Sequence, residues 1–340
     1  MSLRRLFVIA AVLALLIGLW CAGWFYAADQ ARKRMAAWTS AQQTAGNVVT
    51  YDTLTLGGFP FRIVVAIEGP AYGTPAYRWQ ATSLTLAFQP WNLRRFGFQT
   101  AGAQRLDIAT GNKIETIHLT MDQAAGTGSL DQTGAMSAFE SEFRTLSVSV
   151  EQGPAYGFNT LRVDARVPAN PIPKSDGTSL ELAFAADQVA LPADQAILAP
   201  QIERAAGTIA FNGRLPAQPL IPALAAWRDS GGAVDFARLS LKWGALSVEG
   251  DGTVALDNAL QPLAASSLRI SGFNEALDRL AAAGVIRPDA AGATKFALGL
   301  IAKSPDGGGP AVASVPVSIQ GQQVFVGPIV VSRLQPIRWE

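Results

Sequence analysis

The sequence predicts an α+β protein in which an N-terminal transmembrane helix precedes an elongated, twisted antiparallel β-sheet domain with a few packed helices. A continuous apolar run opens the chain, and apolar and polar residues then alternate with a period of two. The 32 glycines and 20 prolines among 340 residues favour turns between short strands over long helices. One-sided strands are typical of antiparallel sheets, whereas parallel α/β sheets show continuous apolar runs.

The first element is the apolar run from Leu6 to Tyr26, which contains no charged residue. At about 1.5 Å per residue it can cross roughly 30 Å of hydrocarbon, and it is longer than the apolar region of about 7–15 residues that a cleaved signal peptide carries. Trp20, Trp24, Phe25 and Tyr26 form an aromatic belt suited to a membrane interface, and Trp20, Trp24 and Tyr26 are the predicted interface residues. We therefore expect residues 1–28 to form a cytoplasmic tip and an uncleaved anchor.

The orientation of this anchor depends on weaker signals. Arg4 and Arg5 precede the apolar run and three basic residues follow it at 32–34, so flanking charge is nearly balanced. The only cysteine, Cys21, lies within the run, and a thiol-free remainder is compatible with an oxidising compartment. We expect a single-pass inner-membrane protein with a periplasmic C-terminal domain.

Residues 29–46 are predicted to form a linking helix that continues into water. The segment from Ala27 to Ala45 lacks proline and glycine, and Gly46 is a suitable residue to end a helix. Residues 47–340 are then expected to form the β-rich domain.

Period-two alternation predicts the strands of that domain. It is clearest in Phe61–Glu68 and Leu161–Val167, and a terminal hairpin is expected around Gly321 and Gln322. Further alternating segments are Leu84–Phe88, Leu146–Val150, Leu180–Phe184, Leu239–Trp243, Val254–Leu256, Leu268–Ile270 and Val315–Ile319.

Four helices are expected in the second half of the chain. They are Ala193–Ala206, Leu220–Asp229, Asn274–Ala283 and Pro288–Lys303. Asn274 is a capping-type residue and Gly284 a C-terminal stop, while Pro288 suits a first helical turn. Two alternatives remain open for the apolar sheet face: helices cover it, or it stays an open groove that accepts acyl chains.

A short motif occurs twice. Gly69–Gly73 and Gly153–Gly157 both read Gly-Pro-Ala-Tyr-Gly, and a Ser-Leu-x-Leu-Ala-Phe segment follows each, at Ser83–Phe88 and Ser179–Phe184. The match predicts a partial internal repeat around residues 69–88 and 153–184, although coincidence in a chain rich in glycine and alanine explains it equally well.

The inventory of reactive side chains indicates a protein that is not an enzyme. His118 is the only histidine and Cys21 the only cysteine, and no G-x-S-x-G segment occurs. We expect no catalytic residue, metal ligand or cofactor. Gly250–Ala255 formally matches a dinucleotide fingerprint, but alternating residues follow it, so a hairpin turn at Asp251-Gly252 is the preferred interpretation. A formal net charge of +1 gives no footprint for nucleic acid.

Two segments stand out as candidate binding motifs. The first is Gly57–Arg62, with the candidate residues Gly58, Phe59, Pro60, Phe61 and Arg62. Glycine permits a tight bend, proline fixes a strand start and the phenylalanines can bury large areas, so a structural corner is the preferred interpretation. The second is Arg94-Arg95 after Pro90-Trp91, which suits lipid headgroups or a partner, although a solvated loop is preferred.

Together with the anchor, Gly46 and a strand at Val48–Leu56, the GGFPFRI segment carries a resemblance. Later matching segments are Leu241–Asp257, Ser271–Asp278 and Val324–Pro328. The chain resembles the bacterial membrane-anchored family called domain of unknown function 2125, which implies no activity. Its layout is also similar to AsmA-like envelope proteins, in which an anchor precedes a curved sheet associated with lipid handling.

The function that we expect is that of a membrane-anchored, non-catalytic cell-envelope protein that binds or handles lipid on an apolar sheet face. The alternative is a protein-interaction or assembly factor of the envelope. A hydrolase based on carboxylates is the third hypothesis, but no pair of acids is singled out by its spacing.

Overall fold

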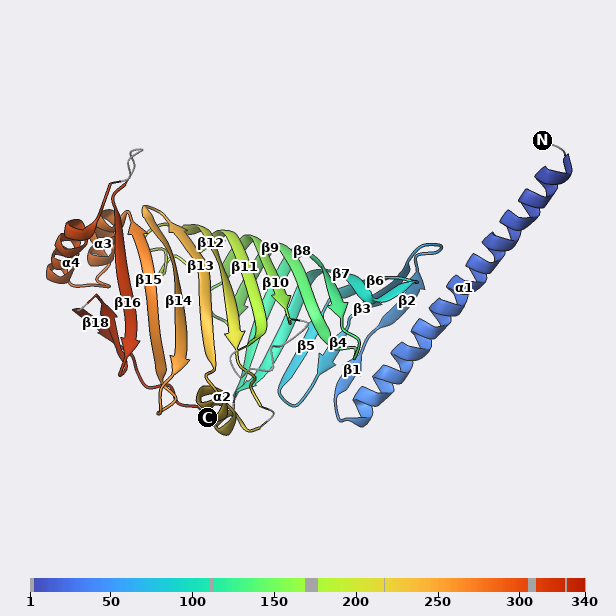
Figure 1. Cartoon of the computed structure of the whole chain (residues 1–340), viewed down its shortest axis with the longest axis horizontal. Coiled ribbons are helices and arrows are strands. Elements are labelled where there is room, and N and C mark those ends of the chain that lie inside the picture. Colours follow the sequence, from blue (N-terminus) through green and yellow to red (C-terminus); the bar gives the residue numbers. More distant parts are fainter. Residues whose placement is uncertain are drawn as a thin grey trace. The chain divides into compact units, whose positions relative to one another are not determined.

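The computed structural model describes residues 3–110, 113–168, 177–216, 218–304, 310–327 and 329–339. The chain divides into two compact units, a first unit from Met1 to Ala135 and a second unit from Met136 to Glu340. An apolar N-terminal helix is followed by antiparallel strands and by helices in the second unit, so the predicted fold class is confirmed (Figure 1). The expected division at residues 28 and 46 stays a prediction.

The first unit begins with one long helix, α1 (Leu3–Thr44), and Gly46 follows it with a φ of 82°. The predicted linking helix is therefore the second half of α1. It does not simply continue into water, because Ala27, Ala31 and Met35 pack against a strand of the same unit. These residues recur every four positions, so they lie on one face of the helix.

The strands of the first unit are β1 (Val48–Thr50), β2 (Thr53–Gly57), β3 (Ile63–Glu68), β4 (Ala71–Gly73), β5 (Tyr77–Ala81), β6 (Ser83–Gln89), β7 (Asn92–Thr110) and β8 (Lys113–Leu130). β7 is long enough to pair with two groups of strands. Its first half pairs with β6, which leads to β3 and β2, and its second half pairs with β5, which leads to β4 and β1. A register shift at Gly102 separates the two halves.

The core of the first unit lies where α1 covers β3. Ile63, Val65 and Ile67 are buried, as the alternation in Phe61–Glu68 predicts, although the strand starts only at Ile63. The expected single strand Val48–Leu56 is wrong in one respect, because residues 51 and 52 divide it into β1 and β2. β1 pairs with β4 and β2 pairs with β3, so the division sends the two pieces to different partners.

The loop between β2 and β3 is a tight turn at the end of this core. Gly58 has a φ of 95°, and the Phe59–Pro60 peptide bond is cis. The Arg62 N–H donates a hydrogen bond of 2.9 Å to the Gly58 carbonyl oxygen, which closes the turn. The tight bend expected at these glycines is present, and the choice between a structural corner and a binding motif stays a prediction.

The second unit is an antiparallel meander from β9 to β18, in which each strand pairs with the next. Its strands are β9 (Met136–Val150), β10 (Tyr156–Arg166), β11 (Thr178–Ala190), β12 (Gln201–Asn212), β13 (Ala233–Trp243), β14 (Leu246–Leu256), β15 (Pro262–Ser271), β16 (Val312–Gln320), β17 (Gln323–Val326) and β18 (Ile329–Arg333). Gly321 and Gln322, both with positive φ, form the expected hairpin between β16 and β17.

The helices of this unit are α2 (Leu220–Asp229), α3 (Phe273–Ala282) and α4 (Pro288–Ile301). Three of the four expected helices are confirmed, but Ala193–Ala206 is wrong because its second half belongs to β12. Asn274 is not the cap of α3 either, since Gly272 occupies that position with a φ of 70°. α3 packs on β14 and α4 on β16, where Phe273 and Leu298 bury Ala313 and Val315 (Figure 1).

The expected turn at Asp251-Gly252 is wrong. β14 passes straight through this segment, and the reversal that precedes it lies at Gly244, which has a φ of 59°. Gly252 pairs with Phe236 on one side and with Ser266 on the other. A dinucleotide fingerprint opens a helix, whereas β14 continues as a strand beyond Gly252. The rejection of the fingerprint is therefore consistent with the structure.

The Gly-Pro-Ala-Tyr-Gly motifs lie in different settings. Gly69–Gly73 ends in the short strand β4, which does not pair with β6, where its Ser-Leu-x-Leu-Ala-Phe segment lies. Gly153–Gly157 leads into β10, which pairs directly with β11 and its matching segment. The internal repeat stays a prediction.

Directly paired residues of an antiparallel sheet point to the same side. When residues are assigned to faces by this rule, the sheet of the second unit has one apolar and one polar face. We call the first the apolar face; in β9–β13 it comprises Phe139, Phe143, Leu161, Val163, Leu182, Phe184, Ile209, Phe211, Phe236 and Leu241. All ten side chains are half-buried.

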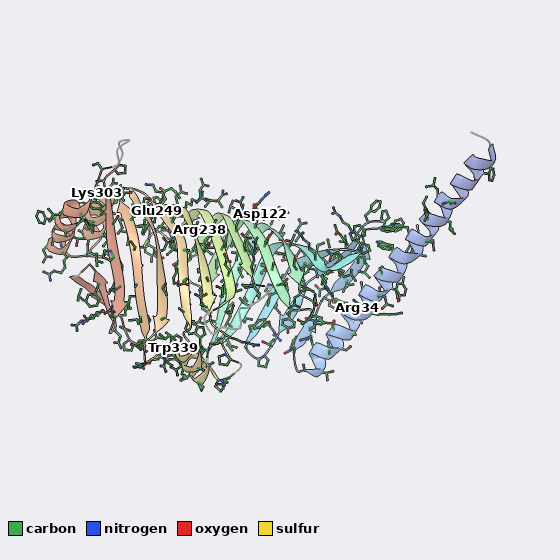
Figure 2. The ribbon with its side chains drawn as sticks, viewed as in Figure 1. Arg34, Asp122, Arg238, Glu249, Lys303 and Trp339 are labelled. Carbon is green, nitrogen blue, oxygen red and sulfur yellow. The ribbon has the colours of Figure 1, made fainter. Side chains whose placement is uncertain are left out.

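The polar face carries ion pairs between neighbouring strands. Arg162 contacts Glu142 at 2.9 Å, and Arg269 contacts Glu249, labelled in Figure 2, at 2.8 Å. Hydrogen bonds from Arg144 and Arg162 hold the pKa of Glu142 below its ordinary value. Exposed pairs of this kind contribute little stability, so burial on the other face dominates.

A comparison of two glycines tests the cap of α3. Gly272 and Gly284 have nearly the same positive φ, but a Cβ at Gly272 would overlap the carbonyl oxygen of Ala245, whereas nothing lies within 4 Å at Gly284. Gly284→Ala should cost only the left-handed strain of roughly 1–2 kcal/mol. Gly272→Ala should cost clearly more, measured as the melting temperature of the purified protein by circular dichroism. Equal losses would contradict the cap geometry.

A second pair tests the turn before β3. A Cβ at Gly58 would lie 2.7 Å from the Arg62 carbonyl oxygen and 2.9 Å from Val64 Cγ2, in addition to the strain of its positive φ. Nothing lies within 4 Å of Gly57. Gly58→Ala should lower the melting temperature by several degrees, and Gly57→Ala should change it little. If Gly58→Ala has the same melting temperature as the wild type, the turn in this loop does not require glycine at position 58.

Candidate functional site

The strongest candidate site is a cluster of aromatic side chains where α1 meets two loops of the first unit. We call it the aromatic collar; it comprises Trp20, Trp24 and Phe25 of α1, Phe59 and Phe61 of the β2–β3 loop, and Trp91 of the β6–β7 turn. Three segments that are distant in the sequence therefore meet in one place.

Trp20 joins the two loops. Its ring centroid lies 6.3 Å from that of Phe61 and 6.0 Å from that of Trp91. Its indole N–H also donates a hydrogen bond of 3.1 Å to the Pro60 carbonyl oxygen. One side chain of the apolar run thus contacts the tips of both loops.

Trp24, one turn further along α1, fixes the base of the collar. Its indole N–H donates a hydrogen bond of 2.8 Å to the Arg62 carbonyl oxygen, and its ring meets Phe59 edge to face at 5.3 Å. Phe25 stacks on Phe59 with centroids 6.0 Å apart. Trp24 is only 7% exposed, so protein surrounds it.

The outer part of the collar is open to its surroundings. Trp91, Phe61 and Phe25 are each more than 60% exposed, and Phe59 is 50% exposed. Contiguous exposed apolar surface marks sites of membrane or protein contact. Exposed arginines border it at Arg62, Arg94 and Arg95.

The structure brings together most of the residues that the sequence singled out. Gly58 and Pro60 shape the loop, and its phenylalanines contact the tryptophans of the predicted belt. Tyr26 is 68% exposed, and none of the ring contacts among the described residues joins it to this cluster, so it stands apart from the collar. The placement of Trp20, Trp24 and Tyr26 at a membrane interface stays a prediction.

Sequence reasoning missed one member of the collar, Trp91, because it was not grouped with the belt of α1. Trp91 lies in the basic-aromatic segment before Arg94 and Arg95, which was considered by itself and interpreted as a solvated loop. A signal was present, since both loops pair phenylalanine or tryptophan with proline and arginine. The sequence offered no evidence that they are neighbours.

The helix that carries the collar is the candidate membrane span of the described residues. Its stretch from Val12 to Thr44 contains a segment long and apolar enough to cross a membrane. A signal sequence near an N-terminus meets the same criteria, so length and composition alone do not separate the two possibilities.

Other groups that could carry chemistry lie outside the collar. His118 is an exposed residue of β8, and no group of three histidine, cysteine or acidic side chains suited to a metal ion occurs in the part of the chain that the structure describes. Burial alone would raise the pKa of Asp107, but hydrogen bonds from Thr116 and Arg105 and the charge of Arg105 hold it below its ordinary value.

A shallow depression of about 470 Å³ on the second unit includes two acids, Asp235 and Asp251. Both have partners: Asp235 accepts hydrogen bonds from Thr253 and Asn212, and Asp251 accepts one from the backbone N–H of Arg238. These hydrogen bonds join neighbouring strands and stabilise a bulge, so a structural role is sufficient to explain where the two carboxylates lie.

Comparison with known proteins gives one finding. No curated protein and no solved structure matches the chain, so the likeness to AsmA-like proteins is not confirmed. A family model, described as an uncharacterized protein conserved in bacteria, matches residues 24–335. The match starts at Trp24, includes the second half of α1 and extends through β18. The chain therefore belongs to this family, domain of unknown function 2125.

Proposed function

We propose that this protein is a non-catalytic component of the bacterial envelope that binds lipid acyl chains on the apolar face of its second unit. In this proposal the apolar run of α1 is an uncleaved single-pass anchor in the inner membrane, and the part of the chain that follows this run is periplasmic. The half-buried apolar face is the observation that carries the lipid-binding part.

Contacts of α1 support its retention. Trp20 and Trp24 donate hydrogen bonds to loop carbonyls, and Ala27, Ala31 and Met35 cover the core of the first unit. A signal peptide is removed before the mature protein folds and has no such partners. Cleavage near Tyr26 would remove the collar's helical half and expose Phe59, and the family match includes Trp24.

The apolar face supports lipid binding because its side chains are only half-buried and lie next to one another on neighbouring strands. Phe184, Ile209 and Phe236 lie on three successive strands, and each is half-buried. Strands lie about 4.8 Å apart, so β9–β13 form a strip roughly 20 Å wide, which is comparable to the length of an acyl chain. Each methylene that leaves water there contributes about 0.8 kcal/mol.

The alternative from the sequence, an envelope interaction factor, would use the same face for a protein. The two proposals differ in the chemistry of the occupant. A partner protein requires hydrogen bonds at a polar rim, whereas an acyl chain requires only apolar contact. The rows between β9 and β13 are apolar except for Ser141, whose hydroxyl already donates to the Val163 carbonyl oxygen, and this favours lipid.

The retention of α1 predicts the state of the mature protein. Intact-mass analysis of the native protein should give the full chain, including Trp20 and Trp24. The protein should resist extraction from membranes by alkaline carbonate. A C-terminal alkaline phosphatase fusion should be active, and a C-terminal green fluorescent protein fusion exported in the same way should be dark. The opposite reporter pattern would reverse the orientation, and a shortened chain would exclude an anchor.

Lipid binding predicts face-specific crosslinking. Photoreactive benzoylphenylalanine at Ile209, on the apolar face, should crosslink to lipid in intact cells. The same group at Ala210, the next residue on the same strand, points to the polar face and should not. Mass spectrometry of the adducts provides the measurement. A repeated protein adduct at position 209 without lipid would favour the interaction factor, and no adduct at either position would reject both.

A further inference from the structure

The aromatic collar has an exposed outer surface that the anchoring function alone does not need. We propose that its two loop tips, Phe59-Pro60-Phe61 and Trp91-Asn92-Leu93, insert into the interface of the leaflet in which the apolar run of α1 ends. The first unit would then hold the membrane at two loops as well as by its helix. This inference rests on the proposed anchoring by α1.

The length of α1 supports insertion. The apolar run must extend from Leu6 to about Tyr26 to cross roughly 30 Å of hydrocarbon, because the distance from Leu6 to Trp20 along a helix is only about 21 Å. Trp20 therefore lies about 9 Å deeper than Tyr26. The Pro60 carbonyl oxygen lies 3.1 Å from the Trp20 nitrogen, so the loop tip reaches the same depth.

The composition of the loops fits that depth. Phe59, Phe61, Trp91 and Leu93 are all exposed, with exposed fractions between 41% and 62%. Aromatic side chains are the residues that proteins place at membrane interfaces. In water this surface would be unfavourable, whereas in the interface each ring replaces contact with water by contact with lipid.

The backbone of the first loop is also prepared for an environment poor in water. Irregular backbone at membrane depth is tolerated only where its polar groups find partners. Trp20 and Trp24 donate to the carbonyl oxygens of Pro60 and Arg62, the Arg62 N–H donates to Gly58, and proline has no N–H. These bonds reduce the cost of removing the turn from water.

Charge around the tips points to lipid headgroups as the neighbouring polar layer. Arg62, Arg94 and Arg95 are exposed and directly follow the aromatic tips in the sequence. Neither loop contains an acidic residue between positions 57 and 63 or between 89 and 96. An arginine near an anionic membrane surface contributes about 1 kcal/mol. Aromatic tips bordered by arginine match the order of acyl chains and phosphates in a leaflet.

The test places one label at a time on the full-length protein in vesicles of phosphatidylethanolamine and phosphatidylglycerol. Cys21→Ala removes the only native thiol, and Phe61→Cys or Trp91→Cys then carries the environment-sensitive fluorophore NBD. Ile114→Cys is the matched control, because Ile114 is 68% exposed in the same unit but lies near the opposite end of β7, roughly 50–60 Å along the strand from Asn92. Leu16→Cys, within α1, reports on the span itself.

Lipids that carry a quencher near the headgroup should quench the label at positions 61 and 91 several-fold more than at 114, with blue-shifted emission at 61 and 91 only. If position 16 is shielded from water while 61 and 91 behave like 114, the loops do not insert and this inference fails alone. If the label at position 16 is also exposed to water, α1 does not span the membrane. The proposed anchor is then rejected, and this inference is rejected with it. Because positions 61 and 91 lie on different loops, disruption of one loop leaves the other as an independent reading.

Discussion

The structure depends on the packing of α1 against β3, because that contact joins the apolar run to the folded part of the chain. Ala27 and Ala31 are small, so the helix approaches the strand closely enough for Met35 and the buried Ile63 and Val65 to fill the space between them. Close packing of this kind tolerates little displacement. The positions of Trp20 and Trp24 over the β2–β3 loop follow from it, and so does the collar.

In the second unit the main constraint is the cover of the apolar sheet face. The antiparallel meander from β9 to β18 has polar residues on one face and must still shield the other. Among the described residues, α3 packs on β14 and α4 on β16. Burial at Phe273, Leu298 and Val315 forms the local core. Across β9–β13 the side chains of the apolar face are half-buried and keep contact with solvent, so this part of the sheet is not a closed core.

The sequence predicts the one-sided strands and most helix ends because each depends on local pattern. Ala193–Ala206 was misinterpreted since alanine favours helices, whereas pairing of β12 with β11 and β13 decides its structure. Gly250 and Gly252 suggested a turn, but β14 uses them where neighbouring strands crowd it: a Cβ at Gly250 would lie 2.7 Å from Leu268 Cδ2. The collar combines separately visible motifs whose meeting depends on tertiary structure alone.

The continuity of α1 from its apolar run into the folded unit has a consequence for movement. A domain on a flexible linker samples many heights and angles above a bilayer, whereas this helix passes without a break from Leu3 to Thr44 and is bonded at Trp20 and Trp24. In the proposed anchoring, the first unit therefore shares the tilt and rotation of the helix that spans the membrane. Under that proposal the unit diffuses laterally in two dimensions but cannot extend outward, so a binding partner of this unit would have to come close to the plane of the membrane.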